Sequence, residues 1–97
     1  MKTKLEKPKI GKKVYCIVDE WIVKYVVGYL GKDSFIIEDY WNVSIDNFGY
    51  EDFGETWFYT IKDAKEKMLA NKGDEYKIVK IYDDEWRLKE KDRKTRK

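Results

Sequence analysis

The sequence contains no histidine, one cysteine and one proline among its 97 residues. The absence of histidine excludes imidazole general bases, serine–histidine triads and histidine metal ligands. The single cysteine, Cys16, excludes an internal disulfide and a zinc site built from thiolates. Cys16 lies in a strand-like segment, where we expect it to be a small buried hydrophobic residue. These absences predict that the chain is not an enzyme and uses no metal or cofactor.

Other motifs that would mark a site or a membrane segment are also missing. The carboxylates near residues 46–49 lack the spacing of a calcium loop, and no GxxxxGK phosphate loop is present. No segment approaches the roughly 18 consecutive apolar residues that a membrane helix needs. The basic start at residues 1–4 lacks the apolar run of a secretory signal. We therefore expect a cytoplasmic protein without membrane attachment.

What the sequence does contain is a large share of charged and aromatic residues. Charged residues make up 41% of the chain, aromatic residues 16% and hydrophobic residues 42%. A chain of this length forms one domain with one core. We predict a single domain over residues 11–86, preceded by a flexible basic arm at 1–10. Residues 87–97 are predicted to be a basic, disordered tail.

Five segments have the composition of short β-strands. They are rich in β-branched and aromatic residues and are bounded by turn-forming residues. They cover residues 12–19, 21–30, 34–41, 56–59 and 76–82. Gly28 interrupts the second segment and predicts a bulge or a sharp bend there. Residues 42–52 are less regular and include turn-forming residues.

One helix is predicted over residues 61–72. Thr60 precedes it and can cap its first backbone N–H groups, and Asp63 suits the positive end of the helix dipole. An apolar stripe on one helical face supports the assignment. The stripe consists of Ile61, Ala64, Met68 and Leu69. Gly73 is placed to end the helix in a left-handed conformation.

This order of elements predicts a mainly β fold with one helix (β+α). Short strands joined by tight turns favour a small SH3-like barrel of about five antiparallel strands. The helix precedes the last strand and would close one open end of the barrel. The alternative is an open antiparallel sheet with the helix packed on one side.

Charge is distributed unevenly along the chain. The net charge is +3 over residues 1–10 and +5 over 87–97, whereas residues 11–86 carry −6. No lysine or arginine occurs between Lys32 and Lys62, and that interval holds seven acidic and nine aromatic residues. Aromatic rings provide large rigid contact areas, and a negative field attracts basic partners and repels phosphates. We therefore predict a protein-binding surface for a partner with a basic surface. Its candidate residues are Asp39, Tyr40, Trp41, Tyr50, Glu51, Asp52, Phe53 and Trp57.

The basic C-terminal residues support an alternative function. Clustered lysine and arginine side chains bind nucleic acid through its phosphates, and exposed tyrosines can stack on bases. The alternative is therefore an SH3-like domain that binds nucleic acid through its basic termini. Its candidate residues are Arg87, Lys89, Lys91, Arg93, Lys94, Arg96 and Lys97.

Two segments resemble small uncharacterised proteins of Firmicutes and of their phages and mobile elements. The first is the GKKVY start at residues 11–15, and the second runs from residue 53 into the predicted helix. The matching positions in the second segment are Phe53, Gly54, Phe58, Thr60, Ala64 and Leu69. These are packing and capping positions, so the resemblance implies an SH3-like fold and an accessory role but no catalytic residue. We expect a phage or mobile-element protein, in its most specific form an anti-CRISPR-like inhibitor that binds the nucleic-acid surface of a host defence nuclease.

Overall fold

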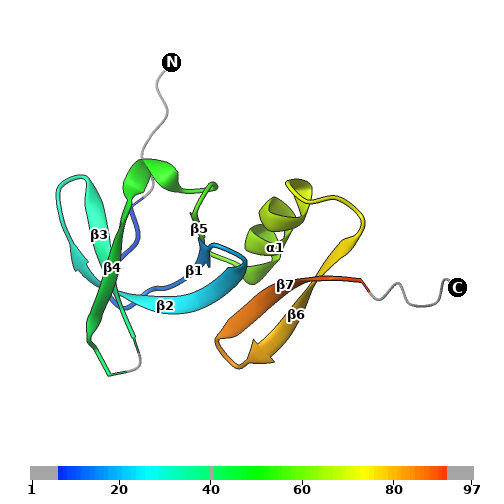
Figure 1. Cartoon of the computed structure of the whole chain (residues 1–97). Helices are drawn as coiled ribbons and strands as arrows, with labels where there is room; N and C mark the ends of the chain where they lie inside the picture. Colours follow the sequence, from blue (N-terminus) through cyan, green and yellow to red (C-terminus); the bar gives the residue numbers. More distant parts are fainter. Residues whose placement is uncertain (1–6, 40, 92–97) are drawn as a thin grey trace, which may run out of the picture.

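The computed structural model describes residues 7–39 and 41–91, which form a mainly β domain with one helix (Figure 1). The described part contains seven antiparallel strands, with the helix before the last two. The elements are β1 (Lys13–Val18), β2 (Trp21–Leu30), β3 (Ser34–Glu38), β4 (Ser44–Gly49), the 3₁₀ turn η1 (Tyr50–Asp52), β5 (Trp57–Phe58), α1 (Ile61–Ala70), β6 (Tyr76–Tyr82) and β7 (Glu85–Glu90).

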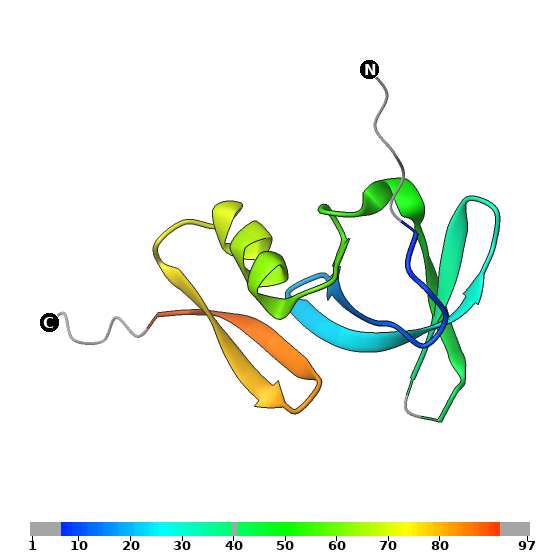
Figure 2. The ribbon, with the colours of Figure 1, turned by 180° about the vertical axis from the view of Figure 1, so that it is seen from behind.

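Strand β2 is the centre of the sheet because three other strands pair with it. Strand β1 pairs with one edge of β2. On the opposite edge, β7 pairs with residues 21–23 and β3 pairs with residues 26–30. Lys24 and Tyr25 lie between these two pairings, and there the β3–β4 and β6–β7 hairpins diverge from each other (Figures 1 and 2).

The predicted bulge at Gly28 is confirmed. The register between β2 and β3 shifts between Val27 and Tyr29, which places Gly28 at the irregularity. The side chain of Glu38 lies against the Cα of Gly28, and a Cβ at this position would collide with the Glu38 carboxyl group. A larger residue at this position would therefore force the flexible Glu38 side chain on the neighbouring strand to move aside.

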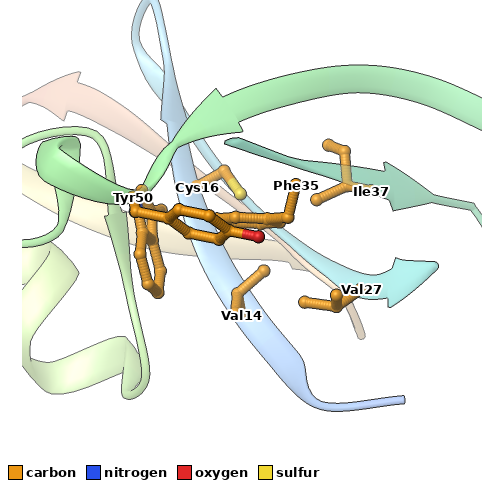
Figure 3. Close-up of a cluster of buried hydrophobic side chains, with 7 residues drawn as sticks. Val14, Cys16, Val27, Phe35, Ile37 and Tyr50 are labelled. Atoms are coloured by element: carbon orange, nitrogen blue, oxygen red, sulfur yellow. The ribbon is translucent and has the colours of Figure 1, made fainter. Parts of the chain in front are cut away.

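Two hydrophobic clusters lie on opposite faces of β1. Val14 and Cys16 belong to the first cluster, whereas Tyr15 and Ile17 pack against the second, as the alternation of side chains along a strand requires. The first cluster consists of Val14, Cys16, Val27, Phe35, Ile37, Tyr50 and Trp57 (Figure 3). The second consists of Ile22, Phe58, Ala64, Met68, Trp86 and Leu88.

Aromatic rings form much of the first cluster, and the indole N–H and the hydroxyl group that they carry are hydrogen-bonded. The Phe35 ring meets the Trp57 ring edge-on at a centroid distance of 4.8 Å. Trp57 Nε1 donates a hydrogen bond to the carbonyl of Gly49, and the Tyr50 hydroxyl donates to the carbonyl of Gly31, both at 2.8 Å. Because both polar groups are paired, the two large rings are buried without leaving a donor unsatisfied.

The helix begins as the sequence predicts. Thr60 Oγ1 accepts the backbone N–H of Asp63 at 3.2 Å, which satisfies one of the unpaired donors of the first turn. Regular helix ends at Ala70, two residues before the predicted end, and Gly73 follows with a φ of +96°. The buried face of α1 contributes Ala64 and Met68 to the second cluster.

The prediction of a five-stranded barrel requires correction. The described residues form seven strands, and the helix precedes two strands rather than one. Strands β4 and β5 stand at the two ends of the order β4-β3-β2-β1-β5, so the sheet does not close on itself. This arrangement is nearer to the alternative, an open antiparallel sheet with the helix on one face.

Two segments that the sequence analysis assigned to irregular structure are strands. Residues 44–49 form β4 in spite of their polar composition. The prediction of a disordered tail from Arg87 is wrong for residues 87–90, which belong to β7. Trp86 and Leu88 alternate with charged neighbours along this strand and are only 7% and 3% exposed. The two apolar side chains belong to the second cluster together with Ala64 and Met68 of α1, and Glu85, Arg87 and Lys89 alternate to the other face.

Candidate functional site

A hollow of about 580 Å³ lies between the tips of the β3–β4 and β6–β7 hairpins. Both tips project from the same side of β2 (Figures 1 and 2). Residues 23–26 of β2 form the floor of the hollow, with Lys13 beside them. One wall comes from Glu38, Asp39 and Trp41, and the other comes from Asp84 and Glu85. We call this hollow and its lining residues the acidic groove.

The acidic groove is negatively charged. Its lining contains four carboxylates, two from each hairpin, and two lysines. The Nζ atom of Lys24 pairs with Asp84 Oδ1 at 3.3 Å, so one positive charge is already engaged inside the groove. The excess of carboxylates gives the groove an electrostatic preference for a cationic ligand.

The loop that carries Trp41 is held by side chains of the same wall. Asp39 Oδ1 accepts the backbone N–H groups of Trp41 and Val43 at 2.8 and 3.0 Å. Asn42 adopts a positive φ of 61°, a conformation that asparagine tolerates, and its Nδ2 donates to Glu38 Oε1 at 3.2 Å. Trp41 is 75% exposed on this loop. The backbone of Trp41 is thus hydrogen-bonded to Asp39, and its side chain presents a large aromatic surface to solvent at the edge of the groove.

The pKa of Tyr25, on the floor of the groove, is affected by carboxylates of both hairpins. Its pKa is raised above the ordinary value of a tyrosine. In decreasing order, the causes are burial, the Cys16 sulfur, and the carboxylates of Glu85, Asp39 and Asp46. Glu85 and Asp39 belong to different hairpins, so their negative potentials overlap at the floor.

The predicted protein-binding residues that lie on the surface are found in two separate places. Asp39 and Trp41 line the acidic groove. Glu51, Asp52 and Phe53 are exposed at and after η1, which lies at the opposite end of β4 (Figure 1). Six residues of strand span about 20 Å, so these two groups do not form one compact site. Tyr40 lies outside the described residues.

Tyr50 and Trp57, also predicted to bind a partner, are core residues. Their side chains are 1% and 0% exposed and belong to the first cluster. A partner on the surface would not contact their rings, so we leave them out of the candidate site.

Eight of the ten residues that line the acidic groove were not predicted from the sequence, among them Tyr25, Glu38, Asp84 and Glu85. Glu38 precedes a predicted site residue in the chain, and the acidic run at 83–85 is visible in the sequence. Asp84 and Glu85 come near the other wall through the pairing of β7 with β2, which places Glu85 opposite Val23. Because β7 was not predicted from the sequence, its contribution to the acidic groove could not be predicted either.

The residues proposed for nucleic-acid binding lie partly on β7. Arg87 and Lys89 alternate with Trp86 and Leu88, so they lie on the sheet face that α1 does not cover. Lys77 on β6 stands directly opposite Lys89. We call Lys77, Arg87 and Lys89 the basic face.

Lys91 follows β7, and its backbone N–H donates to the carbonyl of Glu75. The remaining candidates, Arg93, Lys94, Arg96 and Lys97, lie outside the described residues.

Comparison of this chain with protein-family models, with curated proteins and with solved structures gives no significant match. Within residues 7–39 and 41–91, no three histidine, cysteine, aspartate or glutamate side chains are grouped to hold a metal ion. In the same ranges, no helix has the length and hydrophobicity to cross a membrane. The acidic groove and the basic face are therefore the two surfaces of the described residues whose geometry and charge suggest a function.

Proposed function

We propose that this chain is a non-enzymatic protein-binding module whose acidic groove binds a basic segment of a partner protein. The observation that supports this best is the groove itself, a concave surface with four carboxylates and an exposed tryptophan at its edge. Tryptophan is among the residues that contribute most to protein interfaces, and electrostatic complementarity guides the encounter of partners. The volume of about 580 Å³ lies within the range of roughly 300–1,000 Å³ that is typical of ligand pockets.

An SH3-like description of the first five strands is part of this proposal. The order β4-β3-β2-β1-β5, with a 3₁₀ turn before β5 and a bend in the long β2, supports it. On this description, α1 and the β6–β7 hairpin are additions that follow the SH3-like unit. The added hairpin supplies Asp84 and Glu85, so the groove depends on both parts of the chain.

A more specific form of the proposal is an accessory protein of a phage or mobile element that acts in the cytoplasm of the host. Such a protein would inhibit a host defence nuclease by occupying its nucleic-acid-binding surface, as anti-CRISPR-like proteins do. The carboxylates of the groove support this form because a basic surface that binds phosphates also attracts carboxylates. The resemblance of residues 11–15 and 53–69 to mobile-element proteins is its other support.

Binding of a labelled nona-arginine peptide, followed by fluorescence anisotropy at physiological salt, tests the groove. The double variant Glu38→Gln/Glu85→Gln removes one carboxylate from each wall and keeps side-chain size and a hydrogen-bond acceptor. We expect it to weaken binding about tenfold, because each lost charge contact contributes a modest fraction of the affinity. The matched control Glu51→Gln/Asp52→Asn removes two carboxylates at η1.

The control variant is expected to change the affinity less than about twofold, since η1 lies far from the groove and the charges are screened by salt. Equal weakening by the two double variants would contradict the proposal, because it would mean that the peptide responds only to net charge. Undiminished binding by the groove variant would contradict it as well.

A second candidate function is nucleic-acid binding by the basic face. The specific observation is that Lys77 and Lys89 stand directly opposite each other, although like charges in this position destabilise a strand pair. A polyanion would relieve this repulsion. An electrophoretic mobility assay with a 20-base-pair duplex tests it at low and physiological salt. Salt-sensitive binding that Lys89→Glu abolishes and Lys32→Glu leaves intact would support this function, and absence of binding at low salt would exclude it.

A further inference from the structure

We propose that the acidic groove recognises an arginine side chain of its partner, with the guanidinium stacked on the Trp41 ring and hydrogen-bonded to carboxylates of the two hairpins. This inference rests on the proposed function, because it names the chemical group that the groove selects. It goes beyond a general preference for basic segments, since it distinguishes arginine from lysine.

The acidic groove combines aromatic rings and carboxylates in one hollow. Trp41 and Tyr25 both line the groove, together with carboxylates from both walls. An aromatic face attracts a cation through its quadrupole, and tryptophan does so most strongly. A neutral apolar side chain would fit the rings but would bury carboxylates without a partner, which is unfavourable. The lining therefore matches a ligand that is both cationic and able to stack.

Negative charge reaches the floor of the acidic groove from both of its walls. Asp39 lies on one wall and Glu85 on the other, and both raise the pKa of Tyr25 on the floor between them. A planar guanidinium presents five N–H donors in a fixed fork, so it can donate to carboxylates on two sides while its face stays on a ring. A lysine ammonium is a compact point charge without a stacking face. Opposed carboxylates beside a ring therefore favour arginine.

The described residues contain a comparable arrangement of arginine, tryptophan and carboxylate on another surface. The guanidinium carbon of Arg87 lies 5.1 Å from the centroid of the Trp21 ring. Arg87 Nη2 is 3.4 Å from Glu20 Oε1 at the same time. One arginine is thus held between a tryptophan face and a carboxylate on partly exposed strands of this fold. The groove offers the tryptophan and the carboxylates, and the partner would supply the arginine.

The backbone of Trp41 is held in place by a hydrogen bond before any ligand binds. Asp39 holds the backbone of the Trp41 loop through two hydrogen bonds, and Asn42 ties the same loop to Glu38. A side chain whose backbone is fixed loses less conformational freedom when a ligand arrives, so more of the contact energy appears as affinity. This accounts for a 75% exposed tryptophan on a loop with well-formed internal bonds.

The test compares nona-arginine with nona-lysine peptides on the intact chain by fluorescence anisotropy. We expect the wild type to bind the arginine peptide at least about fivefold more tightly than the lysine peptide. Trp41→Ala is expected to reduce arginine affinity about tenfold and to remove the preference, whereas Trp41→Phe keeps part of it. The control is Tyr29→Ala. Tyr29 is an exposed aromatic residue on β2 outside the groove lining, so its truncation should leave the affinities for both peptides unchanged.

The outcomes separate this inference from the proposed function. If the two peptides bind equally and Trp41→Ala has no effect, while Glu38→Gln/Glu85→Gln still weakens binding, arginine recognition is overturned and protein binding by the groove stands. If none of these variants changes peptide binding, both proposals fail. Urea unfolding of the Trp41 variants shows whether each variant is still folded under the binding conditions, so that a loss of binding is distinguished from a loss of fold.

Discussion

The carboxylate of Asp39 accepts the backbone N–H of Trp41 at 2.8 Å, so one residue both brings negative charge to the acidic groove and fixes the loop that presents its tryptophan. Asp39 Oδ1 also accepts the N–H of Val43, at 3.0 Å. A short acidic side chain commonly satisfies backbone donors of a turn in this way. The charge and the shape of this wall are therefore coupled through a single carboxylate.

Substitutions of Asp39 separate the two contributions. Asp39→Asn keeps a side-chain carbonyl as acceptor and removes the charge, whereas Asp39→Ala removes both. We expect Asp39→Ala to lower the free energy of unfolding by about 1–2 kcal/mol, because two loop N–H groups lose their partner, and Asp39→Asn to lower it by less than about 0.5 kcal/mol. Urea denaturation measures both. Equal destabilisation by the two variants would show that the loop does not depend on these bonds.

The contact between Gly28 and Glu38 gives a prediction for strand packing. Gly28→Ala places a methyl group where the Glu38 carboxyl group lies, and the displaced side chain would lose its bond to Asn42. We expect a loss of about 0.5–1.5 kcal/mol in the free energy of unfolding, because the flexible Glu38 side chain can move aside but gives up a hydrogen bond. Because Glu38 is the obstacle, the double variant Gly28→Ala/Glu38→Ala should be less destabilised, relative to Glu38→Ala, than Gly28→Ala is relative to the wild type. Additive effects of the two substitutions would refute this explanation.

Cys16 gives a prediction for stability at high pH. Burial, with a smaller contribution from Asp46, raises the pKa of the Cys16 thiol from 9.0 to about 12. The folded state thus holds the thiol proton more tightly than the unfolded chain does. This contribution to stability is complete below about pH 9 and is lost progressively between pH 9 and 12.

Comparison with Cys16→Ala isolates this contribution. The wild type is expected to be more stable than the variant at neutral pH, because the substitution leaves a small cavity in the first cluster. The difference in the free energy of unfolding should be constant up to about pH 8 and should narrow above about pH 9. A difference that stays constant to pH 11 would mean that the thiol titrates alike in the folded and unfolded states.

The facing lysines of β6 and β7 give a prediction of the opposite sign. Lys89→Glu replaces a like-charged pair with Lys77 by an oppositely charged pair in the same register. We expect the free energy of unfolding to rise by about 0.2–1 kcal/mol, measured by urea denaturation at low salt. Lys32→Glu has the same change in charge and should not have this effect. Destabilisation by Lys89→Glu would indicate that another group already neutralises the pair.

The sequence predicts those elements of the fold that have a strong local signal. Strand β2, the bulge at Gly28 and the capped start of α1 at Thr60 follow from composition, glycine placement and spacing, and all three are confirmed. Strand β7 was missed because its apolar residues, Trp86 and Leu88, alternate with charged ones inside a basic segment. The alternation is a signal of period two, but the charge of the segment favoured a tail.

The candidate site was predicted only in part, for a physical reason. Asp39 and Trp41 could be identified because they are close in sequence within an acidic and aromatic segment. Asp84 and Glu85 come near them only through the pairing of β7 with β2, a long-range contact without a local signal. The burial of Tyr50 and Trp57 likewise depends on packing around Phe35, which composition does not determine.

The most direct test of the central proposal is a titration of ¹⁵N-labelled protein with the nona-arginine peptide at physiological salt, followed by two-dimensional ¹H–¹⁵N spectra. Each backbone amide reports on its own surroundings, so the spectra locate the binding site without any substitution. We predict the largest shift changes at residues 23–26 and at Glu38, Asp39, Trp41, Asp84 and Glu85, with small changes at residues 51–53. Shift changes that are concentrated at residues 51–53, or that are absent from residues 23–26, would contradict the assignment of the acidic groove as the binding site.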